Sequence, residues 1–192
     1  MKKLIITIDG PAASGKEKIA KYISKKWKLN HLDSGILYRR LALIFLNENI
    51  CDIEVMSSDL HGCELGPEFA ELMIDEYPIL SIAASFANSP SVFRGLKELR
   101  VKESDRLKLI LLNLQNCGVN CKSENDDLFI FPSKEYQIKN NLIQTDFDHR
   151  IAMAFSIMGT KLGPLNIKDS DSINTSFPTF KNEFKNLGGS IF

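Results

Sequence analysis

The sequence predicts an α/β fold. Short apolar runs alternate with longer segments of helical periodicity along most of the chain, as strands and helices do in α/β proteins. Of the 192 residues, 44% are hydrophobic and 25% are charged, which suffices for one domain or two small ones with a packed core. A polar stretch over residues 47–51 interrupts the alternation, so we place a seam between two pieces there.

For the first piece, the sequence predicts a strand, a loop and two helices, in that order. Residues 4–8 form a short β-branched run, typical of a buried strand, and a glycine-containing loop over 10–16 follows it. Residues 19–27 repeat apolar side chains at helical spacing, and residues 37–46 predict a second helix.

The second piece begins with a predicted strand over residues 53–55 and a loop over 62–67. A helix is expected over 75–86, with Pro78 in its first turn, where proline is tolerated. A strand over 92–94 follows it.

An amphipathic helix is predicted next, over residues 104–116. Its apolar stripe consists of Leu107, Ile110, Leu111 and Leu114. Gly118 stands where glycine commonly ends a helix. Residues 119–121 and 128–131 then predict a hairpin across the acidic turn 124–127.

The remaining segment predicts a helix, a strand and a helix. The first helix spans residues 148–158, the strand 165–167, and the last helix 178–187, before two glycines. Side chains expected in the core of the first helix are Ile151, Phe155 and Met158.

The charge balance excludes a broad basic surface. The chain has 24 basic and 24 acidic residues, so its formal net charge is zero and general nucleic-acid binding is not expected. No apolar run approaches the roughly 18 residues needed to cross a membrane, and Asp9 cuts the N-terminal apolar run too short for a secretion signal. Four cysteines without metal-ligand spacing favour reduced thiols in a cytoplasmic protein: Cys51, Cys63, Cys117 and Cys121.

The loop over 10–16 has the pattern G-x-x-x-x-G-K between a strand and a helix. Backbone N–H groups around Gly10 and Gly15 can converge on phosphate oxygens, and Lys16 can reach the terminal phosphates. The hydroxyl that would hold magnesium is missing, because Glu17 follows the lysine.

Residues 8–16 and 32–39 resemble the N-terminus of the cytidylate kinase family. The resemblance implies that Lys16 grips ATP phosphates and that Ser34 and Arg39 hold a nucleoside monophosphate. It ends near residue 49, and one strand with two helices cannot form the parallel sheet of such a kinase. We therefore expect residues 1–49 to be a fold fragment without kinase turnover; weak binding of ATP or phosphate is the alternative.

Acids and bases gather at the starts of three predicted helices. They are Asp75, Lys102, Glu103, Arg106, His149 and Arg150. Lys102 and Arg106 are four residues apart and can face one site if their helix starts early. Helix N-termini add partial positive charge, so the pattern favours an anionic phosphorylated or carboxylated substrate handled by acid–base chemistry. The alternative is a set of helix caps and surface ion pairs.

These residues lie in motifs that resemble the 5-enolpyruvylshikimate-3-phosphate (EPSP) synthase family. The resemblance runs from about residue 52 to 192, and the matching stretches are residues 63–68, 73–80, 98–106, 148–154 and 174–178. It implies part of an enolpyruvyl-transferase domain built from repeated α/β units. It also implies a transferase of the shikimate pathway, which moves the enolpyruvyl group of phosphoenolpyruvate to shikimate 3-phosphate for aromatic amino-acid biosynthesis.

The resemblance also implies roles for individual residues. Asp75 would accept the proton of the attacking hydroxyl, and Glu103 would exchange protons with the methylene carbon of phosphoenolpyruvate. Lys102 would contact shikimate phosphate, and His149 would position its neighbours. Arg106 and Arg150 would clamp the anionic groups of phosphoenolpyruvate. No metal and no organic cofactor is implied.

The family enzyme has two similar domains that close on the substrates, whereas the resemblance covers only the later part of the second one. Catalysis needs the complete set of groups in a closed site, so we expect weak or no turnover from this chain alone. Two further interpretations stay open: a nonfunctional fusion of two gene fragments, and a phosphate-binding module without chemistry.

Overall fold

The computed structural model describes residues 59–191. The elements expected at 4–8, 10–16, 19–27, 37–46 and 53–55, together with Ser34 and Arg39, lie outside the described residues.

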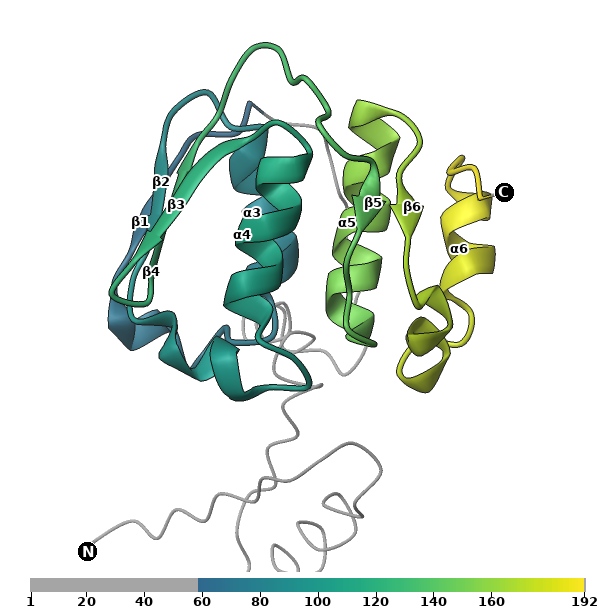
Figure 1. Ribbon diagram of the computed structural model, residues 1–192, viewed down its shortest axis with the longest axis horizontal. Coiled ribbons are helices and arrows are strands. Elements are labelled where there is room, and N and C mark those ends of the chain that lie inside the picture. The colour runs from purple at the N-terminus through teal and green to yellow at the C-terminus, as the bar shows by residue number, and fades with distance from the viewer. Residues whose placement is uncertain (1–58, 192) are drawn as a thin grey trace, which may run out of the picture. The chain divides into compact units, whose positions relative to one another are not determined.

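A four-stranded sheet forms one outer layer (Figure 1). Its strands stand in the order β1 (Glu64–Leu65), β2 (Ser91–Phe93), β4 (Asp127–Phe131) and β3 (Asn120–Glu124). β1 and β2 are parallel, because helix α3 (Tyr77–Ser85) connects them, and the other neighbours are antiparallel.

A second pair of strands, which are parallel, is separated from the first sheet by α3 and α4 (Figure 1). β5 (Leu142–Ile143) pairs with β6 (Asn166–Ile167), and α5 (His149–Leu162) connects them. With α4 (Arg106–Asn116) after β2 and α6 (Phe180–Asn186) after β6, the order strand–helix–strand–helix occurs twice. The described residues therefore have a mixed α/β fold, as the alternation in the sequence predicts.

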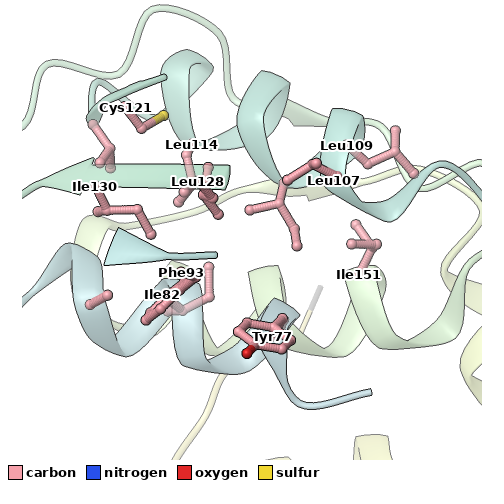
Figure 2. Packing of buried hydrophobic residues seen from close by; sticks show 14 of the residues in the cluster. Tyr77, Ile82, Phe93, Leu107, Leu109, Leu114, Cys121, Leu128, Ile130 and Ile151 are labelled. Atoms are coloured by element: carbon pink, nitrogen blue, oxygen red, sulfur yellow. The ribbon is translucent and has the colours of Figure 1, made fainter. Parts of the chain in front are cut away.

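The main core lies between the sheet and the helices α3, α4 and α5 (Figure 2). Tyr77 and Phe93 are fully buried and meet edge to face, with ring centroids 5.5 Å apart. α3 also packs against α5, which brings Ile151 into the same cluster. Each large apolar side chain buried here stabilises the fold by about 1.5–3 kcal/mol.

The helices begin later than the sequence suggests, and this fixes the position of the charged residues. α3 begins at Tyr77, so Asp75 precedes it. α4 begins at Arg106, and Asp105 caps it by accepting from Lys108 N at 2.9 Å. The early helix start that would let Lys102 and Arg106 face one site from the same helix does not occur, because Lys102 lies in the loop before that cap.

The apolar stripe of α4 is confirmed at Leu107, Ile110 and Leu114, which are buried, whereas Leu111 is only partly buried. Asn113 is also fully buried. Its amide donates to Gln144 O at 2.7 Å and accepts from Gln144 N at 2.9 Å, so it ties α4 to the end of β5.

The predicted hairpin is confirmed as β3 and β4, with a tighter turn than the acidic run suggests. Asn125 and Asp126 alone form it, with φ values of 51° and 66°. A left-handed pair suits the right-handed twist of a hairpin. At the other end of β3, Gly118 has a φ of 85°, and a Cβ there would meet Gln137 O at 2.4 Å, so glycine is required.

The short strands were the least predictable elements. Residues 62–67 were expected to be a loop but contain β1, and β5 was not predicted at all. α5 is confirmed with its three core residues and runs on to Leu162, and the last helix begins at Phe180.

Among residues 59–191, no helix is both long and apolar enough to cross a membrane. Cys63, Cys117 and Cys121 are free thiols. Burial raises the pKa of Cys117 to about 11 and that of Cys121 to about 12, so these two thiols stay protonated and unreactive at neutral pH.

Candidate functional site

The guanidinium of Arg106 is completely buried and lies between three carboxylates. Nε donates to Asp148 Oδ2 at 2.7 Å, Nη1 to Asp75 Oδ1 at 2.8 Å, and Nη2 to Glu103 Oε2 at 2.5 Å. Burial alone would lower the pKa of Arg106, but its hydrogen bond with Asp148 and the surrounding negative charges raise it instead. A buried cation is tolerated here because every nitrogen of the guanidinium has an anionic partner.

Asp75 lies between two arginines. Besides Arg106, it pairs with Arg150, whose Nη2 is 3.1 Å from Asp75 Oδ2 and whose Nη1 donates to Asp75 O at 3.2 Å. Burial raises the pKa of Asp75, but the charges of Arg150, Arg106 and Lys102 outweigh it, so the pKa lies below its ordinary value. Asp75 is therefore ionised at neutral pH.

Asp148 joins the starts of α4 and α5. Its Oδ1 accepts from the backbone N–H groups of Arg150 at 2.9 Å and Ile151 at 3.3 Å, which caps α5. Its Oδ2 accepts from Arg106 Nε and, at 2.9 Å, from Ser104 Oγ. Asp148 belongs to the motif over residues 148–154 but was not among the site residues predicted from the sequence; its signal is an aspartate directly before a helical pattern.

The outer members of the cluster face solvent. The side chain of Glu103 is 50% exposed, that of Asp75 38% and that of Arg150 35%. Lys102 is partly exposed, and its charge reaches Asp75. His149 is the first residue of α5; burial lowers its pKa, so its imidazole is neutral at pH 7.

The structure thus brings together the sequence-selected residues between 75 and 150. They come from the segments that lead into α3 and α4 and from the first turns of α4 and α5, and helix N-termini carry partial positive charge. Half-exposed carboxylates beside two guanidinium groups can move protons next to a bound anion. The residues expected to bind nucleotide, Gly10, Gly15, Lys16, Ser34 and Arg39, lie outside the described part of the chain.

Other kinds of site have less support among the residues that the structure describes. No group of histidine, cysteine and carboxylate side chains among residues 59–191 could hold a metal ion. A cavity of about 500 Å³ lies along α3 and α5, lined by residues such as Ile82, Phe86 and Ile157, but by none of the charged cluster. We assign the site to the charged cluster because a mostly apolar cavity offers little to an anionic substrate.

Comparison with known proteins shows which family the chain matches. Residues 23–184 match the family described as EPSP synthase (3-phosphoshikimate 1-carboxyvinyltransferase). This match covers most of the chain and begins before the seam expected at residues 47–51.

Individual relatives carry the same name. A 3-phosphoshikimate 1-carboxyvinyltransferase of Paramagnetospirillum magneticum is 44% identical over 145 residues, which are 75% of this chain and 32% of the relative. One from a Methylobacterium species is 42% identical over 165 residues, 85% of this chain and 34% of the relative. The chain therefore spans about a third of the length of these relatives.

Solved structures agree with the fold. An EPSP synthase from Acinetobacter baumannii matches with a TM-score of 0.63 and 35% identity, over 68% of this chain and 31% of that structure. A second structure of the enzyme from this organism gives a TM-score of 0.61 with 31% identity, over 68% and 30%.

Proposed function

The chain belongs to the EPSP synthase family, and on this premise we propose that it supplies one face of an enolpyruvyl-transfer site. The reaction joins the enolpyruvyl group of phosphoenolpyruvate to the 5-hydroxyl of shikimate 3-phosphate and releases phosphate, by addition and then elimination. The observation that carries the proposal is the convergence of two partly exposed acids with two arginines at the starts of three helices.

Asp75 and Glu103 move the protons in this proposal. Asp75 takes the proton of the attacking hydroxyl; its lowered pKa keeps the carboxylate ionised, which is the form that can accept a proton. Glu103 gives a proton to the methylene carbon during addition and removes one during elimination. Its half-exposed side chain can reach a substrate in the solvent-facing part of the cluster.

The basic residues bind the anionic groups of the substrates. Arg150 exposes a third of its side chain and can take a carboxylate or phosphate directly. Arg106 is buried, so it can bind a substrate carboxylate or phosphate only if Glu103 or Asp75 releases the guanidinium. Lys102 binds the phosphate of shikimate 3-phosphate, and His149, neutral at pH 7, positions its neighbours. The proposal requires neither a metal nor an organic cofactor.

We further propose the division into a cytidylate kinase-like fragment, residues 1–49, and a transferase portion, residues 52–192, in a cytoplasmic protein. The fragment would bind ATP or phosphate weakly at Lys16 and have no kinase turnover. A Lys16→Ala variant should lose any thermal stabilisation by ATP while keeping that by phosphoenolpyruvate. Equal stabilisation of both proteins by ATP would contradict nucleotide binding at this loop.

The transferase proposal is tested by amide NMR of the 192-residue chain during addition of phosphoenolpyruvate and shikimate 3-phosphate. We expect shifts at the starts of α3, α4 and α5. Arg150→Gln should weaken binding by about tenfold or more, because a charge-assisted contact contributes about 1.5–3 kcal/mol.

Arg94→Gln is the matched control. Arg94 is 40% exposed and forms its ion pairs with Glu64 and Asp127, neither of which belongs to the cluster, so its loss should leave affinity unchanged. Saturable shifts confined to other parts of the chain, or equal losses in the two variants, would refute the assignment of the site.

A further inference from the structure

The carboxylate of Asp148 performs two tasks with two different oxygens. Oδ1 caps α5, whereas Oδ2 accepts from Arg106 Nε and Ser104 Oγ. The side chain is fully buried, so it cannot touch a substrate that stays in the solvent-facing part of the cluster. Any effect on the reaction has to pass through another residue.

Arg106 is the residue through which Asp148 can act. A guanidinium is planar and rigid, so fixing Nε at one edge also fixes the directions of Nη1 and Nη2. Those two nitrogens hold Asp75 and Glu103, the acids assigned to proton transfer. Asp148 therefore sets the orientation of both acids across two ion pairs, from a position locked to the backbone of α5.

We propose that Asp148 is a positioning residue: it anchors the guanidinium of Arg106, and through it aligns Asp75 and Glu103 for the reaction. The roles of these two acids rest on the proposed function, but the anchoring itself does not. It explains why the motif places an aspartate directly before the residues that begin α5, and why the neighbouring Ser104 directs its hydroxyl to the same oxygen.

The Asp148→Asn variant separates the two tasks. Asparagine is as good a helix cap as aspartate, so α5 keeps its start, but the charge that anchors Arg106 is lost. NMR hydrogen exchange of the Arg106 Nε–H group reports the anchoring directly. We expect exchange to accelerate by about tenfold or more, since a hydrogen bond to a charged group is worth about 1.5–3 kcal/mol.

Asp105→Asn is the matched control, because Asp105 also caps a helix of the cluster and pairs with an arginine, Arg100, at the surface. It should leave Arg106 exchange unchanged. If Asp148→Asn does not fold, Asp148→Ser keeps an oxygen that can cap α5 but removes the carboxylate that holds Arg106, and it should accelerate exchange likewise. Unchanged exchange of Arg106 in the folded Asp148→Asn variant, or in Asp148→Ser where that is the one tested, overturns the proposal.

Affinity for phosphoenolpyruvate tests the link to function. If Asp148 acted only as a negative charge near an anion site, it would weaken the binding of phosphoenolpyruvate, and Asp148→Asn would strengthen binding. If Asp148 positions Arg106, the effect on affinity is the opposite, and Asp148→Asn should weaken binding. In a chain that already carries Arg106→Met, Asp148→Asn should then cause no further loss of affinity. Stronger binding, or equal losses in both backgrounds, overturns the alignment role. A wild-type chain that binds no phosphoenolpyruvate refutes the proposed function instead, and the exchange experiment then decides on the anchoring alone.

Discussion

At the scale of single residues, Arg106 determines how the charged cluster is built. Its guanidinium has no exposed surface and is contacted by three carboxylates. Of these three, only Asp148 is fully buried. Water can solvate the carboxylates of Asp75 and Glu103 if their contacts with Arg106 break, but it cannot reach the carboxylate of Asp148. Stability and site geometry therefore both depend on the pair formed by Arg106 and Asp148.

Arg106→Met should destabilise the chain by about 3–5 kcal/mol, because it leaves the charge of the buried Asp148 carboxylate without its cationic partner. The free energy of unfolding in urea measures this. Arg100→Met is the control: Arg100 pairs with Asp105 and Asp126 where all three are about one-third exposed, so about 0–1 kcal/mol is expected. Equal costs for the two variants would show that burial of the pair has no energetic consequence.

The sequence identified most of the cluster but not its internal arrangement. Charged residues before helical patterns pointed to Asp75, Glu103, Arg106 and Arg150, which the structure brings together. That Arg106 is buried could not be foreseen, because it depends on contacts between residues 31 and 42 positions apart. Asp148 was not predicted as a site residue, because an aspartate before a helix is common as a helix cap.

At the scale of elements, helices were easier to predict than strands. α4 and α5 carry long apolar stripes, and each repeats its signal over several turns. The two strands that were missed, β1 and β5, have two residues each, which is too short for any alternation to be visible. β6 is equally short, but the strand predicted over 165–167 is confirmed there. The positions of these strands are set by the parallel partners that α3 and α5 connect to them.

The turn before α5 is strained. Asp146 and Phe147 have φ values of 47° and 62°, in the left-handed region, and Phe147 is 74% exposed, so packing does not offset the strain. Asp148 N donates to Thr145 O at 2.9 Å across these two residues, so the turn leads directly into the cap of α5.

Phe147→Gly should be more stable than Phe147→Ala by about 1 kcal/mol, because a side chain in the left-handed region costs about 1–2 kcal/mol that glycine avoids. The two midpoints of urea unfolding measure the difference. The same pair of substitutions at Ile157, a partly exposed position within α5, should give the opposite order, with alanine more stable by about 1 kcal/mol. The same order at both positions would contradict a strained turn.

At the scale of the whole molecule, the repeated order of elements places the charged cluster where the two repeats meet. Asp75 and Arg106 come from the first repeat, whereas Asp148 and Arg150 come from the second. The ion pairs therefore cross from one repeat to the other. The outer side of the cluster stays partly exposed through Asp75, Glu103 and Arg150, and about two thirds of the relative from Paramagnetospirillum magneticum lie outside the matched region.

We expect the 192-residue chain to catalyse enolpyruvyl transfer at least about a thousandfold more slowly than a full-length relative, a deficit of about 4 kcal/mol in barrier height. Two or three charge-assisted contacts from the missing two thirds, each worth about 1.5–3 kcal/mol, account for this. Release of phosphate from phosphoenolpyruvate that depends on shikimate 3-phosphate is the measurement. Glu103→Gln should abolish any residual rate, because it removes the group proposed to exchange protons with the methylene carbon. A rate within about tenfold of the full-length enzyme, still dependent on Glu103, would mean that the groups in this chain suffice for the reaction.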